Sequence, residues 1–328
     1  MSVYRIYGSE LSPYSVKVRS YFRYTGLPHE WIPRSPAVQA EFQKYAKLPL
    51  VPLVVTPDEE GLQDSTPIME RLEADKPLLK PDDPALAFLS ALIEEYGDEW
   101  GNKWMFHYRW RYQPDAWSTA ERIAQQMMGA QGTLAVAQGR AAVAERMTGR
   151  LGFVGSNAKT EATIEASFQR ALTLIEAHLQ SRPYMLGGRP AMADFGLWGQ
   201  LYEAATDPTP GAIMRKASPK VMAWVERMLA PKNEGPFETW TALAPTLMPL
   251  LKEEVAGVFL PWSVANAAAI AGDQRSFEMT LAGAPWSQEP QKYHARSLAE
   301  LRRKYVAAKG AAGLEDILKE SGCLPYLS

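Results

Sequence analysis

Four consecutive residues near the start of the chain, Ser12-Pro13-Tyr14-Ser15, stand where a short strand pattern gives way to an amphipathic helix pattern. A redox-active Cys-x-x-Cys pair suits such a junction, because the helix N-terminus stabilises a thiolate. Serines hold positions 12 and 15 here, which excludes electron exchange by a protein dithiol. The helix start still offers a hydroxyl and unpaired N–H groups to an anion. We interpret it as a place that activates a sulfur brought in by another molecule.

Two further short motifs fit a small ligand. Pro52 lies at the entry to a strand pattern, where a cis-proline turn would leave the backbone of Val51 free for pairing; a plain loop proline is the alternative. Asp64 and Ser65 precede a helix pattern. A carboxylate, a hydroxyl and free N–H groups at that place can hold the two charged ends of an amino acid, and a simple helix N-cap is the alternative.

The elements that position these motifs alternate over the first eighty residues. Period-two patterns and turn signals predict strands at residues 3–7, 29–32, 53–56 and 62–63, and helical spacing predicts helices at 14–24, 38–45 and 66–74. The order is βαβαββα, which is an α/β arrangement. Three prolines and two adjacent aspartates in residues 75–84 indicate a linker after it.

The rest of the chain is predicted to be helical, without a strand pattern of comparable quality. Helices are expected at residues 86–113, 118–151, 160–181, 193–205 and 219–229, with short helices at 237–255 and 297–308 among proline-rich loops. Trp240, Phe259, Trp262 and Tyr293 supply apolar anchors but no clear independent core, so we expect residues 231–328 to pack as an extension on the helical domain. The predicted division is 1–80, 85–230 and 231–328.

Composition narrows the function classes. Charges nearly cancel, 35 basic against 37 acidic, which argues against nucleic acid or an anionic membrane as partner. Cys323 is the single cysteine and the four histidines are scattered, so a disulfide is excluded and we expect no metal site. The first residues lack a secretory pattern, and the apolar stretch 255–272 favours a buried helix pair over a membrane span. We expect a cytoplasmic protein.

Aromatic residues follow helical spacing in the first long predicted helix. Tyr96, Trp100, Trp104, Tyr108 and Arg111 are separated by four, four, four and three positions, so they share one face. That face could bind an apolar or aromatic substrate. Core packing is the alternative, and we place it slightly ahead.

Residues 3–230 resemble the glutathione S-transferase family, which joins a thioredoxin-like N-terminal domain to an all-helical C-terminal domain. The resemblance rests on residues 12–19, on Leu50-Val51-Pro52-Leu53 and on Asp64-Ser65-Thr66-Pro67-Ile68. It implies glutathione as co-substrate, with Val51 and Pro52 at its cysteinyl part and Asp64 and Ser65 at its γ-glutamyl end. It also implies a homodimer, whose geometry the extension could change.

The resemblance places the catalytic hydroxyl at Ser12, where it would hydrogen-bond the glutathione sulfur and favour the thiolate. Ser15, Tyr14 and Tyr7 are the competing hydroxyls, and Tyr14 is also a candidate for the substrate pocket with Trp100, Trp104 and Tyr108. The family often has Asn-Pro-x-Gly where this chain has Ala46-Lys47-Leu48-Pro49. Arg34, Lys44 and Lys47 are candidates to bind the glycine carboxylate of glutathione, but only because they are positively charged.

These observations predict a cytoplasmic glutathione transferase of the detoxification type, whose bound thiolate attacks a small apolar or aromatic electrophile. A glutathione-dependent isomerase, dehalogenase or ether-cleaving enzyme would use the same thiolate. A non-catalytic binding or scaffolding protein is the third possibility, and an extension that plugs the cleft would favour it.

Overall fold

The computed structural model describes residues 3–328, and a four-stranded sheet forms the centre of its N-terminal part. The strands are β1 (Tyr4–Gly8), β2 (His29–Pro33), β3 (Leu53–Val55) and β4 (Gly61–Gln63), in the spatial order β2-β1-β3-β4. β1 runs parallel to β2 and antiparallel to β3, and β4 is antiparallel to β3. With the helices between them, these strands confirm the predicted βαβαββα order.

Helices cover both faces of this sheet. They are α1 (Pro13–Thr25), the short helix η1 (Pro36–Val38), α2 (Gln39–Tyr45) and α3 (Ser65–Glu73). Tyr7 and Leu53 pack with Phe42 of α2 in one small core, while Ile6 and Val54 belong to the main core with residues of α1 and α3. Because neighbouring positions on a strand point to opposite faces, β1 and β3 each serve both cores.

The second part, residues 84–227, consists of helices joined by loops, with one isolated β-bridge between Tyr184 and Gly187 in the loop before α9. Its helices are α4 (Pro84–Glu95), the π-helical turn η2 (Tyr96–Gly101), α5 (Asn102–Arg111), α6 (Gln113–Met128), η3 (Gly129–Gln131), α7 (Thr133–Thr148), η4 (Leu151–Val154), α8 (Glu161–His178), α9 (Met192–Thr206), α10 (Pro208–Ala217) and α11 (Pro219–Arg227). The single helix expected at 118–151 is wrong, because Gly132 adopts a φ of 95° and splits it into α6 and α7. Helix α10 was not predicted.

The extension differs most from its prediction. Its elements are α12 (Trp240–Leu250), the π-helical turn η5 (Leu251–Phe259), α13 (Leu260–Ala271), the strands β5 (Phe277–Leu281) and β6 (Ala284–Gln288), α14 (Lys292–Ala308), α15 (Leu314–Ser321) and α16 (Leu324–Leu327). The first three run on as one helix of 32 residues, and the antiparallel hairpin β5–β6 was not expected. The π-helical turn lies between Pro249 and Pro261, where missing N–H donors loosen the α-helical hydrogen-bond pattern.

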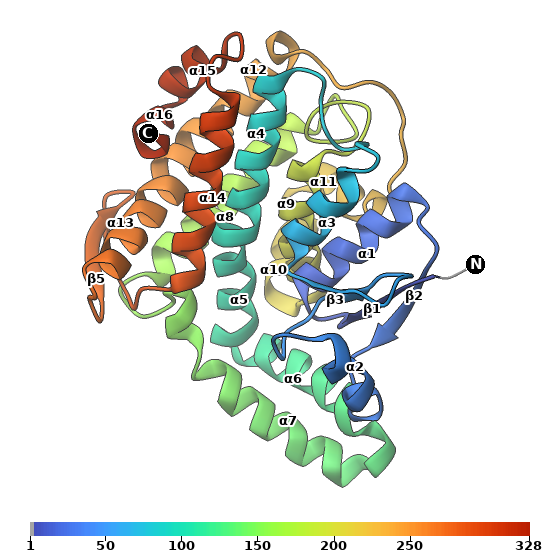
Figure 1. The fold of residues 1–328 in the computed structure, drawn as a ribbon. Coiled ribbons are helices and arrows are strands. Elements are labelled where there is room, and N and C mark those ends of the chain that lie inside the picture. Colours follow the sequence, from blue (N-terminus) through green and yellow to red (C-terminus); the bar gives the residue numbers. More distant parts are fainter. Residues whose placement is uncertain (1–2) are drawn as a thin grey trace.

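Helix α4 lies between the extension and the N-terminal domain. Figure 1 shows α14 along one side of α4, with α3 and α1 on the other side. Side chains from all three parts join one buried apolar cluster, including Phe22, Trp100 and Trp262. The helix Trp240–Ala271 is long and apolar enough to cross a membrane by length and composition, but half of its most apolar window is buried in the protein, as in a core helix.

Candidate functional site

Ser12 is the N-cap of α1, and its hydroxyl accepts one hydrogen bond but donates none to another described residue. Its Oγ accepts from the N–H of Ser15 at 3.3 Å, and Pro13 begins the helix. Within residues 3–328, Ser12 Oγ donates to no acceptor, so its proton is free for a ligand. A half-buried hydroxyl at a helix N-terminus can therefore donate to an anion that also benefits from the helix dipole.

The competing hydroxyls are less well placed. Ser15 is fully buried, and its Oγ has no hydrogen-bond partner among the described residues. Tyr7 is buried against Phe42, at 6.0 Å between ring centres, on the α2 side of the sheet. Tyr14 donates to the main-chain oxygen of Asp98 at 3.2 Å, and burial raises the pKa of its hydroxyl well above the ordinary value. These contacts favour Ser12 over the other three hydroxyls.

The Val51–Pro52 peptide bond is cis, as the sequence indicates. Val51 lies just outside β3, and its N–H and C=O form no hydrogen bond with another described residue. Both groups are thus available to an extended ligand, which is the role that the sequence assigns to Val51 and Pro52.

Asp64 precedes α3 in an unusual backbone conformation, with φ 76° and ψ 123°. A positive φ in a residue other than glycine carries strain and is often found at functional sites. Its side chain does not cap α3. Instead both carboxylate oxygens accept from the hydroxyl of Tyr293, at 3.1 and 3.2 Å. The simple N-cap explanation therefore fails for Asp64, while Ser65 begins the helix and is buried.

A buried ionic cluster adjoins this end of the site, and sequence reasoning missed it. Lys17 of α1 lies 2.5 Å from carboxylate oxygens of both Glu94 and Asp98, and donates to Thr66 of α3 at 3.0 Å. Burial raises the pKa of Asp98 to about 8 against the pull of Lys17. Burial opposes ionisation of Glu94 as well, but Lys17 prevails and lowers the pKa of that carboxyl. A lysine within an amphipathic helix gives no sequence signal for such burial.

The predicted aromatic pocket is mostly core. Trp100, Trp104 and Tyr108 are 0–2% exposed, and both indole N–H groups donate to Ser167 Oγ, at 2.8 and 3.0 Å. The extension adds Trp262 and Trp286 against Trp100, at 5.6 and 5.4 Å between ring centres. Their burial favours the core-packing alternative for these three residues, whereas Tyr14 is only half-buried and remains a candidate for the substrate pocket.

The three basic residues that are candidates to bind the glycine carboxylate differ in the contacts that their charged groups already make. The Arg34 guanidinium stacks over Phe42 at 3.9 Å, and Lys44 pairs with Glu41. Lys47 is exposed, and its ammonium has no ion pair within the described part of the chain. Its main-chain N–H donates to Gln63 at 2.8 Å, which ties the segment to β4. Of the three charged groups, that of Lys47 has the fewest contacts with other described residues.

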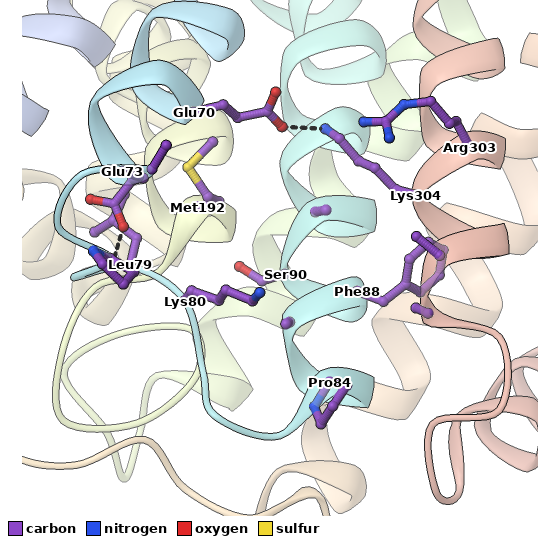
Figure 2. A pocket seen from close by; sticks show the side chains of 16 residues that line it. Glu70, Glu73, Leu79, Lys80, Pro84, Phe88, Ser90, Met192, Arg303 and Lys304 are labelled. Atoms are coloured by element: carbon purple, nitrogen blue, oxygen red, sulfur yellow. Dashed lines mark hydrogen bonds and ion pairs between the residues drawn. The ribbon is translucent and has the colours of Figure 1, made fainter.

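One well-defined cavity lies away from these residues. It measures about 590 Å³ and opens between α3, α4 and α14, with Glu73, Phe88, Met192 and Arg303 in its wall (Figure 2). An ion pair between Lys304 and Glu70, at 2.7 Å, crosses it. None of the predicted site residues lines it. Over residues 3–328 no group of three or more histidine, cysteine or carboxylate side chains could hold a metal ion.

Two family models match the chain. The glutathione S-transferase N-terminal domain covers residues 6–81, and the glutathione S-transferase C-terminal domain covers residues 135–227. The chain belongs to the glutathione S-transferase family, with the thioredoxin-like and helical domains that this family defines.

Similar proteins carry the same family name. A curated relative, isoprene-epoxide–glutathione S-transferase of Rhodococcus sp. (strain AD45), is 27% identical over 229 residues, which is 67% of this chain and 92% of the relative. Among solved structures, a glutathione S-transferase of Methylobacterium radiotolerans in complex with glutathione sulfonate is 20% identical, covering 72% of this chain and 96% of that chain with a TM-score of 0.41. One from Rhodospirillum rubrum F11 is 17% identical, with the same coverage and a TM-score of 0.45.

Proposed function

We propose that this chain is a glutathione transferase in which Ser12 stabilises the thiolate of bound glutathione. The observation that carries the proposal is the open donor of Ser12 at the start of α1. A hydrogen bond to sulfur together with the helix N-terminus favours the thiolate over the thiol, whose usual pKa is about 8.5. A pKa lowered by two units corresponds to about 2.7 kcal/mol.

The rest of the glutathione molecule would lie along two motifs. Free main-chain groups of Val51 beside Pro52 suit the cysteinyl part, and Asp64 with Ser65 suits the γ-glutamyl end. Lys47 is the favoured partner for the glycine carboxylate. The name of the Rhodococcus relative supports a small apolar epoxide as the electrophile. The thiolate would attack an epoxide carbon, the carbon–oxygen bond would break, and the resulting alkoxide would take a proton from solvent.

The test is an ultraviolet difference titration of the thiolate band with glutathione across pH. Wild-type protein should show saturable binding and a thiol pKa about two units below that of free glutathione. Ser12→Ala should still bind glutathione but restore the ordinary pKa. Ser15→Ala is the matched control and should behave as wild type. An unchanged band in Ser12→Ala moves the catalytic hydroxyl to Ser15, Tyr14 or Tyr7; absence of binding to wild type removes the proposal.

Isomerase, dehalogenase and ether-cleaving activities would use the same Ser12–thiolate pair. They differ in the fate of glutathione, which returns free, is oxidised or stays attached, so product analysis by mass spectrometry separates them. A binding or scaffolding role is favoured by one observation only, the hydrogen bond from Tyr293 of the extension to Asp64. The Ser12 hydroxyl has no such bond from the extension.

We also propose that the protein works in the cytoplasm as a homodimer. The dimer follows from the family resemblance, and the single cysteine, which favours a reducing compartment, supports the cytoplasm. Because α14 of the extension packs on α4, a dimer interface would have to use other surface of the helical domain. Light scattering of the purified full chain tests the dimer directly: a mass near 36.5 kDa would mean a monomer and overturn it.

A further inference from the structure

The extension contacts the proposed glutathione site at one side chain. Tyr293 lies in the first turn of α14, and its hydroxyl reaches Asp64, 229 residues earlier in the chain. About half of the Tyr293 surface is exposed, so the contact lies at the edge of the site and not in the core.

The start of α14 is held firmly in place. The Gln291 N–H donates to Asn266 Oδ1 at 2.8 Å, and the Asn266 amide donates to Gln291 O at 3.0 Å. His294 hydrogen-bonds the carboxylate of Glu99, and its ring packs on Trp262 at 4.9 Å. Further along α14, Lys304 pairs with Glu70 of α3, as Figure 2 shows. Tyr293 is therefore presented to Asp64 by a fixed helix.

Asp64 differs from the neighbouring carboxylates in its partners. Glu94 and Asp98 share Lys17, and Glu99 has His294. Asp64 has no lysine, arginine or histidine within ion-pair distance in residues 3–328 and receives only the neutral hydroxyl of Tyr293. Two carboxylate oxygens provide about four acceptor positions, so this bond leaves room for a cation.

We propose that Tyr293 is a positioning residue that holds the Asp64 carboxylate in place to receive the α-ammonium group of the γ-glutamyl end, so that the extension completes the glutathione site. This inference rests on the function proposed above. It assigns to residues 231–328 a role in recognition of the amino group, and it predicts discrimination between ligands with and without that group.

The protonation state of Tyr293 suits this role. Although half of the side chain is exposed, partial burial of the hydroxyl end, and next the negative charges of Glu99 and Asp64, raise the pKa of its hydroxyl above the ordinary value. The phenol consequently stays protonated and remains a donor at every pH at which the protein would work. Its donation fixes one rotamer of Asp64, whose backbone is already held in the left-handed region.

The experiment compares two ligands by isothermal titration calorimetry: glutathione, and its analogue N-glutaryl-cysteinylglycine, in which the α-amino group is absent. Tyr293→Phe should weaken glutathione binding about tenfold, as expected for a lost hydrogen bond to a charged group. The same substitution should change binding of the glutaryl analogue by less than twofold. In turnover with an epoxide, KM for glutathione should rise while kcat stays constant.

Tyr112→Phe is the matched control, because the Tyr112 hydroxyl also donates to a carboxylate, that of Glu165, outside the proposed site. It should leave both ligands unaffected. Asp64→Asn should weaken glutathione binding, and in that background Tyr293→Phe should have no further effect. Comparing Asp64→Asn with the double variant separates the loss of the Tyr293–Asp64 hydrogen bond from any change that Tyr293→Phe makes to the local backbone.

The outcomes separate the two proposals. Unchanged glutathione binding in Tyr293→Phe, or equal weakening of both ligands, overturns the role of Tyr293 and leaves the transferase proposal standing. If wild-type protein binds neither ligand, the transferase proposal fails and this inference fails with it. Weakening of glutathione alone supports both.

Discussion

Helix α4 and the turn η2 contact the N-terminal domain through a buried ammonium group, whereas they contact the extension through aromatic rings as well as through the hydrogen bonds of Glu95 with Ser297 and of Glu99 with His294. Towards the N-terminal domain, Glu94 and Asp98 hold the buried ammonium of Lys17. Towards the extension, Tyr96 packs on Phe259 and Trp100 packs on Trp262, at 6.0 and 5.6 Å between ring centres. Figure 1 shows both regions along this helix.

We infer from this difference that the aromatic contacts with the extension mainly stabilise the fold, whereas the ionic contact with the N-terminal domain affects the proposed binding site. Buried aromatic rings contribute through apolar area and packing, with little dependence on pH. A buried ion pair adds less to the stability of the fold, because the cost of removing both charges from water offsets their attraction. Its contribution to the free energy of folding changes, however, when one of the charged groups gains or loses a proton. The ionic contact also lies beside Thr66 at the start of α3, next to the proposed γ-glutamyl end. Three substitutions test this division.

The largest loss of stability is expected for Trp262→Ala. Trp262 is fully buried, donates to Gln288 at 2.9 Å, and has the Lys103 ammonium 3.8 Å from its ring. Removing it should lower the free energy of unfolding by roughly 3–5 kcal/mol, as for other large core truncations. Urea denaturation followed by circular dichroism measures this loss. Trp117→Ala, at a site 41% exposed, is the control and should cost less than about 1 kcal/mol. Equal losses would mean that the extension adds little stability.

A smaller loss is expected for Lys17→Met. Removing one partner of a buried ion pair typically costs roughly 3–5 kcal/mol, because the other charge stays buried. Here the loss should fall near the lower end, because Asp98, with its pKa of about 8, is already protonated at neutral pH and only the Glu94 carboxylate is left as an unpaired buried charge. The same denaturation experiment applies.

Neutralising the carboxyls provides the control for Lys17→Met. The triple variant Lys17→Met, Glu94→Gln, Asp98→Asn should recover much of the lost stability, because no buried charge remains in the cluster. If the triple variant is no more stable than Lys17→Met, Lys17 stabilises the fold through packing of its alkyl chain. The contacts of α4 with the N-terminal domain and with the extension would then differ less than we infer.

The same contrast explains what the sequence could predict. Ser12, the cis-proline at Pro52 and the break before α3 arise from capping and turn chemistry within a few residues, so local patterns indicate them. The βαβαββα order follows from the same local signals. The roles in glutathione binding remain predictions, because no ligand tests them.

The extension could not be predicted in this way. Its hairpin turns through Ala282 and Gly283, both with positive φ, where an Asn-Gly or Asp-Gly pair would have been a recognisable signal. Its long helix continues beyond residue 255, where the predicted helix ends, and passes through Pro261, because buried neighbours such as Trp262 hold it together. The contact from Tyr293 to Asp64 joins segments 229 residues apart, and local sequence patterns carry no signal for such a contact.

The smallest expected effect is the pH dependence of stability from Asp98. The folded protein keeps this proton up to about pH 8, whereas the ordinary value of an aspartate is 3.8, so a rise in pH favours unfolding. Burial raises the pKa of Glu203 and of Glu254 to about 7, which acts in the same direction. Burial lowers the pKa of His107 and His178, which acts in the opposite direction but only below their ordinary value of 6.5.

Burial also lowers the pKa of Lys103 well below its ordinary value, which acts in the opposite direction between pH 6.5 and 8, but the four carboxyls with raised pKa values, Glu95, Asp98, Glu203 and Glu254, outnumber it. The Tm should therefore fall as the pH rises, by about 2–4 °C for each kcal/mol lost. Asp98→Asn removes one of these protons, so its Tm should fall less over the same interval. Asp82→Asn, at an exposed position, should follow wild type. Thermal denaturation in a series of buffers measures all three proteins. A slope in Asp98→Asn as steep as in wild type would place the pH dependence in the other buried carboxyls, Glu95, Glu203 and Glu254, none of which pairs with Lys17, because burial raises the pKa of each of them as well.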